Sequence, residues 1–280
     1  MIEADPTVSP SPPPPAAPWG VPAAPAADPV VTLLGVPIAN VTRARALGII
    51  EELIRSYDGR PRSVFFANAH TLNLAAARPD YLGVLNSADY VFGDGTGARW
   101  AARLKGVRLE DNLNGTDLVP ELFEATAGRG YRYFLLGAEP KTVETAARAA
   151  EACFRGWQQA GFHHGYLDDA QTLVEVIERI NQARPHVLLV GMGNPRQEEW
   201  IVRYRHRLRV PLCMGVGGLF DFWAGKFRRA PAWIRRAGHE WVWRLLEDPR
   251  DKARRYLLGN PLFLARAIRD AFRQRSRGTP

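Results

Sequence analysis

Cysteine and long apolar runs are both scarce in this sequence. Only Cys153 and Cys213 occur in 280 residues, which excludes a disulfide framework, and we expect two reduced core thiols in a cytoplasmic protein. There is no run of about 18 apolar residues. The N-terminus has no basic stretch followed by an uninterrupted apolar one. The sequence therefore predicts neither a membrane-spanning helix nor a secretory signal.

Motifs of several familiar nucleotide and metal sites are also missing. No glycine-rich loop continues into Gly-Lys-Ser/Thr, which argues against a P-loop NTPase. The segment GDGTG supplies only a G-x-G-x-G pattern, so a nucleotide-binding oxidoreductase stays an alternative. His163 and His164 are adjacent and would point to opposite faces of a strand, so we expect no metal site there.

The first 29 residues are rich in proline and alanine and show no apolar periodicity. Such a segment cannot bury enough apolar surface to offset the entropy lost on ordering, so we predict a disordered tail over residues 1–29. Hydrophobic residues make up 46% of the whole chain, which suffices for a sizeable core in the rest of it.

Positive charge is concentrated near the C-terminus. Residues 226–280 contain 15 Lys and Arg against 5 Asp and Glu, a net +10, while the whole chain carries +8, so the rest sums to −2. The predicted C-terminal appendage, residues 219–280, is dense in Trp, Phe and Arg and mainly helical in pattern. It suits an anionic membrane surface, and it also suits a helical cap packed on a sheet. A nucleic-acid-binding protein is a further alternative, but no recognition module is present.

Residues 30–218 alternate apolar runs of strand length with amphipathic helical patterns. This alternation predicts a Rossmann-like α/β core with a mainly parallel sheet flanked by helices. The predicted strands lead into four glycine-rich segments, GDGTG, LGAEPK, VGMGNPRQ and GVGG. Because the carboxyl ends of parallel strands lie at one edge of a sheet, we expect these four loops to form a ligand site there.

Local signals indicate where elements begin. Residues 30–39 predict a strand or hairpin, and Thr42 lies near the start of a helix. Pro140 occupies the first turn of another helix, and Pro79 interrupts a helical segment. We expect Thr116 or Asp117 to cap the helix that follows NLNG.

Two of the glycine-rich loops, LGAEPKT and VGMGNPRQEEW, lead directly into a helix. Free N–H groups and the dipole of a helix N-terminus favour a phosphate, although ordinary strand-to-helix turns have the same composition. Gln197 is a candidate to bind a sugar or base, and Glu198 complements the helix dipole. His70 either contacts the ligand or caps a helix. Asp94 is a turn residue, a neighbour of a phosphate loop, or the group that performs the chemistry.

Seven motifs in order between Val31 and Tyr256 resemble the WecG/TagA/CpsF glycosyltransferases. They are FFANAHTLNLAAARPDY, ADYVFGDGTGARWAARLKG, NLNGTDLVPELF, YFLLGAEP, VLLVGMGNPRQEEWI, GVGGLFDFWAGKFRRAPAWI and HEWVWRLLEDPRDKARRY. The resemblance implies an inverting, metal-independent glycosyltransferase without a cofactor. It also implies a UDP-sugar donor and a polyprenyl-diphosphate-linked saccharide acceptor, in exopolysaccharide or other surface-polymer synthesis. The protein would be cytoplasmic, peripheral on the inner face of the bacterial membrane, and able to self-associate.

By this resemblance, Asp94 is the catalytic base. Inverting transfer needs such a base near the acceptor hydroxyl, and it needs positive groups beside the leaving diphosphate. The arginines of the appendage would supply those groups by closing over the site, and the 137–141 and 191–197 loops would hold the nucleotide. The substrate-binding candidates are Asn68, His70, Gly95, Thr96, Asn114, Asp117, Gly137, Gly191, Gly193, Asn194, Pro195, Gln197, Glu198, Gly217, Arg244, Arg254 and Arg255.

Three positions depart from the family pattern. Phe66 and Asn112 stand where many members have Thr and Arg, and Asp251 stands where an Arg often follows the E-P-x stretch. The NAHTLN and NLNGTD forms resemble the exopolysaccharide branch more than the teichoic-acid branch. UDP-glucose or a related sugar is therefore an alternative donor to a mannosamine nucleotide.

Overall fold

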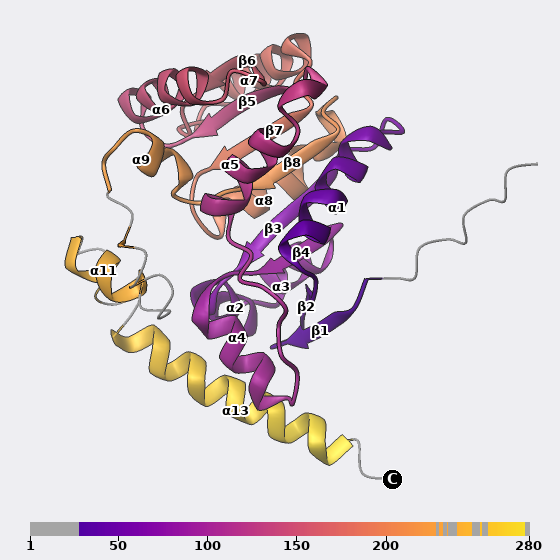
Figure 1. The fold of residues 1–280 in the computed structure, drawn as a ribbon, viewed down its shortest axis with the longest axis vertical. Coiled ribbons are helices and arrows are strands. Elements are labelled where there is room, and N and C mark those ends of the chain that lie inside the picture. Colours follow the sequence, from indigo (N-terminus) through magenta and orange to yellow (C-terminus); the bar gives the residue numbers. More distant parts are fainter. Residues whose placement is uncertain are drawn as a thin grey trace, which may run out of the picture.

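In a computed structural model, the chain forms an eight-stranded sheet with helices on both faces (Figure 1). The predicted Rossmann-like α/β class is confirmed. Nearly all of the predicted N-terminal tail lies outside the described residues. The structure describes residues 28–227, 230–231, 234, 240–247, 253 and 257–277.

The sheet has the order β1-β2-β4-β3-β8-β7-β5-β6. Every neighbouring pair is parallel except β1 and β2, which form an antiparallel hairpin, one of the two alternatives predicted for residues 30–39. The edge strand β6 escapes sequence prediction because QQAGFH contains no apolar run. The strands are β1 (Val30–Leu33), β2 (Val36–Ala39), β3 (Arg62–Ala67), β4 (Tyr90–Gly93), β5 (Arg132–Gly137), β6 (Gln158–His163), β7 (Val187–Gly191) and β8 (Leu212–Gly215).

A capping side chain or a proline marks the start of several helices. As expected, Thr42 caps α1 and Pro140 occupies the first turn of α6. The predicted interruption at Pro79 is also present, because α2 ends at Ala77 and α3 begins at Pro79. The prediction that Thr116 or Asp117 caps α5 is wrong, because the Asn114 side chain accepts the Asp117 N–H at 2.9 Å. The described helices are α1 (Arg43–Arg55), α2 (Ala69–Ala77), α3 (Pro79–Asn86), α4 (Gly95–Leu104), α5 (Gly115–Ala125), η1 (Ala127–Arg129), α6 (Pro140–Cys153), α7 (Ala170–Ala183), α8 (Arg196–Tyr204), η2 (Arg205–Arg207), α9 (Leu219–Trp223), α11 (Glu240–Glu247) and α13 (Gly259–Arg277).

Two apolar cores lie on opposite faces of the sheet. One face packs against α2, α3, α4, α7 and α8, with α13 added to the same core over α2 and α4, and the other face packs against α1, α5, α6 and α9. Successive residues of a strand point to opposite faces of the sheet. Phe65 therefore packs in the first core and Phe66 in the second. Cys213 is buried in β8, but the expectation of a core thiol is wrong for Cys153, which is exposed at the last residue of α6.

The central strands β3 and β8 create the crevice of the fold. The chain leaves β3 into α2 on one face of the sheet and leaves β8 into α9 on the other. Neighbouring strands whose connections depart to opposite faces open a crevice beyond their carboxyl ends, where ligands of such sheets bind. The topology therefore places a site at the ends of β3, β4, β7 and β8.

Helix α13 lies across α2 and α4 (Figure 1). One side of α13 is buried, as shown by Phe263, Ala267 and Ala271. The Asp270 carboxylate accepts hydrogen bonds from Lys105 Nζ at 2.7 Å and from the Leu34 N–H at 2.9 Å, which fixes the second half of the helix. Within the described part of the chain, no helix combines the length and the apolar composition needed to cross a bilayer.

Candidate active site

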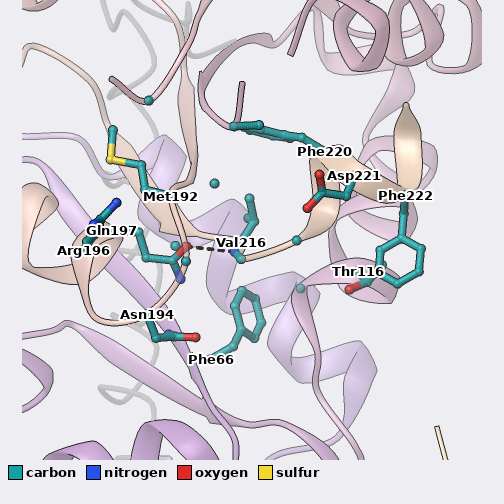
Figure 2. A pocket seen from close by; sticks show the side chains of 18 of the residues that line it. Phe66, Thr116, Met192, Asn194, Arg196, Gln197, Val216, Phe220, Asp221 and Phe222 are labelled. Carbon is teal, nitrogen blue, oxygen red and sulfur yellow. Dashed lines mark hydrogen bonds between the residues drawn. The ribbon is translucent and has the colours of Figure 1, made fainter. Parts of the chain in front are cut away.

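A cavity of about 440 Å³ opens at the carboxyl edge of the sheet. All four glycine-rich loops contribute to it, which confirms that they gather at one edge. In Figure 2, one wall carries Met192, Asn194, Arg196 and Gln197, and the opposite wall carries Thr116, Phe220, Asp221 and Phe222. The lining residues are Phe66, Asn68, Asp94, Gly115, Thr116, Ala138, Glu139, Gly165, Tyr166, Gly191, Met192, Gly193, Asn194, Arg196, Gln197, Gly215, Val216, Gly217, Gly218, Phe220, Asp221, Phe222, Lys226 and Phe227.

Asp94 and Asn68 form a polar pair on this cavity. Each is the residue directly after a strand, and the parallel register of β3 and β4 pairs Ala67 with Gly93, so the two side chains come together. Asn68 Nδ2 donates to Asp94 Oδ2 at 3.3 Å. Asn68 Oδ1 accepts the N–H groups of His70 and Thr71 at 3.0 and 3.2 Å, so Asn68 is the cap of α2. The geometry thus fixes the amide of Asn68 with its N–H side toward the carboxylate.

Glu198 is a fully buried carboxylate directly behind the cavity wall. Its oxygens accept Asn194 Nδ2 at 2.6 Å, Gln197 Nε2 at 2.7 Å and the Tyr81 hydroxyl at 3.1 Å. Burial raises the pKa of Glu198 to about 7, although these donors act in the opposite direction. Burial and the neighbouring carboxylate also raise the pKa of Tyr81.

The Glu198 network fixes the orientation of Gln197. The Gln197 amide donates to Glu198, so its oxygen faces the loop after β8, where it accepts the Gly217 N–H at 2.9 Å (Figure 2). One side chain therefore ties the first turn of α8 to the β8–α9 loop. This gives the wall of the cavity a defined shape across two strands.

Gly137 shapes the cavity without contributing a side chain. Its φ is +142°, and a Cβ there would lie 2.3 Å from the carbonyl oxygen of Gly191. A side chain would collide with backbone that cannot move aside. Glycine is thus required for the loops after β5 and β7 to approach each other.

Positively and negatively charged side chains both line the cavity. Arg196, the first residue of α8, is exposed there. Lys226 Nζ donates to Glu139 Oε2 at 2.7 Å and lies 4.0 Å from Asp221 Oδ1. The lysine lowers the pKa of Glu139. Two cations and the dipole of a helix N-terminus make this part of the cavity suitable for an anion. The described residues contain no group of three or more His, Cys, Asp or Glu placed to hold a metal.

Most of the chain matches a known protein family. Residues 31–277 match the model of the glycosyl transferase WecG/TagA/CpsF family. The chain belongs to this family. Two relatives, from Staphylococcus aureus strains MW2 and NCTC 8325 / PS 47, are named N-acetylglucosaminyldiphosphoundecaprenol N-acetyl-beta-D-mannosaminyltransferase. Each is 32% identical over 219 residues, which cover 78% of this chain and 85% of the relative.

The predicted site residues of this WecG/TagA/CpsF chain fall into three groups. Those that line the cavity are Asn68, Asp94, Gly191, Gly193, Asn194, Gln197 and Gly217. Those that lie beside the lining, in the same loops and helix starts, are His70, Gly95, Thr96, Asn114, Asp117, Gly137, Pro195 and Glu198. Arg254 and Arg255 lie outside the described residues. Arg244 lies on α11, with its side chain outside the described part.

Several lining residues were not named individually in the prediction. Glu139 and Arg196 lie in the 137–141 and 191–197 loops that were expected to hold the nucleotide, and their charge beside a helix start was the available signal. Tyr166 follows the unpredicted strand β6, so no signal placed it at the edge. Phe220 and Lys226 lie in the segment predicted as appendage.

Two of the three departures from the family pattern can be located. Phe66 lines the cavity and has its ring centroid 6.0 Å from that of Phe92, with Gly115 close against it. Asn112 Oδ1 accepts the N–H of Gly95, the residue after Asp94, at 2.6 Å. Asp251 lies outside the described residues.

Proposed function

We propose that this chain transfers a sugar from a UDP-sugar to a hydroxyl of a polyprenyl-diphosphate-linked saccharide, in the synthesis of a surface polymer such as an exopolysaccharide. The observation that carries the proposal is the Asp94–Asn68 pair on the wall of a 440 Å³ cavity, in a chain of this glycosyltransferase family. The staphylococcal relatives are named for an N-acetylmannosaminyl group and a diphosphoundecaprenol-linked N-acetylglucosamine. These names make N-acetylmannosamine the first donor to test and glucose the second.

In the proposed reaction, the oxygen of the acceptor hydroxyl attacks the anomeric carbon of the donor sugar, and Asp94 accepts the proton of that hydroxyl. The bond from that carbon to the UDP oxygen breaks, and the configuration inverts because attack occurs from the opposite side. The leaving diphosphate would lie at the N-terminus of α8 beside Arg196, with Lys226 across the cavity. These groups stabilise its charge, so we propose that no metal is required.

The proposed location is the inner face of the cytoplasmic membrane. Leu258 and Leu262 are exposed at the start of α13, and Arg269 and Arg273 are exposed further along it. Trp100, on the neighbouring helix α4, is 53% exposed. Exposed leucine, tryptophan and arginine together are typical of a surface that binds anionic lipid. Because α4 begins directly after Asp94, this surface adjoins the site where a lipid-linked acceptor would react.

A transfer assay tests the proposed activity. The full chain is incubated with N-acetylglucosaminyl-diphospho-polyprenol and, separately, with UDP-N-acetylmannosamine, UDP-glucose, GDP-mannose or NAD. We expect one UDP-sugar to give a lipid-linked disaccharide and UDP, with a rate unchanged by EDTA. The same UDP species should raise the melting temperature, because a ligand that binds only the folded state stabilises it. Stabilisation by NAD alone, without transfer from any UDP-sugar, would contradict the proposal.

Vesicle binding tests the proposed membrane surface. We expect sedimentation with vesicles containing anionic phospholipid, and weaker binding in high salt. Leu258→Ser combined with Leu262→Ser should reduce binding about tenfold, because two apolar side chains no longer enter the interface. Val174→Ser on α7, another partly exposed apolar residue, is the matched control and should bind as wild type does. Equal binding by all three proteins would refute the assignment of this surface.

A further inference from the structure

Asp94 occupies the N-cap position of α4 without acting as its cap. An Asp at this position ordinarily accepts an N–H of the first helical turn. Within the described part of the chain, the Asp94 side chain makes no such bond. Instead, Asn112 Oδ1 accepts the Gly95 N–H at 2.6 Å. A side chain that lies 18 residues further along than Asp94 therefore satisfies the first free donor of this helix.

Asn112 is held in place from two sides. Its carbonyl oxygen accepts Arg43 Nη2 at 3.0 Å, and the Arg43 N–H donates to Asp111 Oδ2 at 2.7 Å. The N–H of the next residue, Leu113, donates to the Gly93 carbonyl at 3.0 Å. The segment is thus attached both to the start of α1 and to the end of the strand that carries Asp94. These bonds hold the Asn112 side chain beside the Gly95 N–H.

We propose that Asn112 is a positioning residue, which accepts the Gly95 N–H, holds the peptide between Asp94 and Gly95, and so keeps the Asp94 carboxylate directed at Asn68 and the cavity. This inference rests on the proposed role of Asp94 as base. If Asn112 lost its acceptor, the Gly95 N–H would be left without one, and the peptide between Asp94 and Gly95 would turn and bring the carboxylate onto the N–H groups of Thr96 and Gly97, where an N-cap side chain ordinarily bonds. A carboxylate turned onto its own helix is both misplaced for the acceptor hydroxyl and less basic, since N–H donors stabilise its charged form.

The test compares two asparagines that each hold the 107–113 loop through backbone bonds. Asn112→Ala removes the acceptor at Gly95. Asn40→Ala is the matched control, because Asn40 accepts the Glu110 N–H at 2.9 Å and donates to the Arg108 carbonyl at 3.2 Å, away from α4. We expect Asn112→Ala to lower kcat about tenfold with both KM values within about twofold, the pattern of a misplaced base. Asn40→Ala should keep the wild-type kcat.

Asn112→Asp distinguishes positioning from general damage to the loop. Its carboxylate can accept the Gly95 N–H, so kcat should return to within about threefold of wild type. Equal losses of kcat in Asn112→Ala and Asn40→Ala, or a loss in Asn112→Asp as large as in Asn112→Ala, would overturn the inference. Asp94→Asn is measured in the same assay. Full activity in that variant would refute the proposed base itself, which separates the two failures.

Discussion

Replacing Asp94 by asparagine should lower kcat by a factor of about 10³ or more, because the variant has no group able to accept the proton of the acceptor hydroxyl. The substitution conserves the size of the side chain. Its amide oxygen can still accept Asn68 Nδ2, which lies 3.3 Å from Asp94 Oδ2. The fold, the melting temperature and the stabilisation by UDP should therefore stay close to wild type. The measurements are steady-state transfer rates and a thermal-shift titration with UDP.

The matched control for Asp94 is another carboxylate of the same cavity. Asp221 lines the opposite wall and lies 4.0 Å from Lys226. Asp221→Asn should alter KM for the donor more than kcat, since its charge lies beside a cation proposed to face the diphosphate. If Asp94→Asn retained wild-type kcat and Asp221→Asn lost it, the base would have to be reassigned to the other wall.

Sequence patterns predicted the site because they report backbone geometry at strand ends. Parallel strands with apolar runs must end at a common edge, so the shared location of Asp94 and of the VGMGNPRQ loop followed from the alternation of strands and helices, without knowledge of the strand order. The strands β3, β5 and β7 were recognisable because they are buried on both faces, which requires continuous apolar sequence.

Other features depend on long-range contacts that no local pattern reports. The edge strand β6 is only half covered, so its sequence is not selected for continuous apolar residues, and Tyr166 after it was missed. The cap of α5 was misassigned because Asn114, Thr116 and Asp117 are all capping residues by type, and only the backbone decides among them. The bond from Gly95 to Asn112 joins residues 17 apart, and no pattern in the sequence predicted it.

The stability of the fold should fall as pH rises through the range in which Glu198 ionises. Burial raises the pKa of Glu198 from its usual 4.5 to about 7. Between these values the folded chain keeps a proton that the unfolded chain has released, so the free energy of unfolding decreases with increasing pH. The decrease attributable to Glu198 should total about 3 kcal/mol, at roughly 1.4 kcal/mol per pKa unit, and should level off above pH 7.

Glu198→Gln isolates this contribution, because glutamine fills the same volume and does not titrate. Urea unfolding at pH 5, 6, 7 and 8 should show the stability of wild type falling relative to the variant across this range. Glu199→Gln is the matched control, since Glu199 belongs to the same helical turn but lies partly exposed in an ion pair with Arg78 at 2.8 Å. That variant should follow the wild-type pH dependence. Parallel curves for wild type and Glu198→Gln would show that Glu198 is already ionised in the folded chain from pH 5 to 8, as it is in the unfolded chain. The Asn194 and Gln197 amides would then keep their orientation toward the cavity independently of pH.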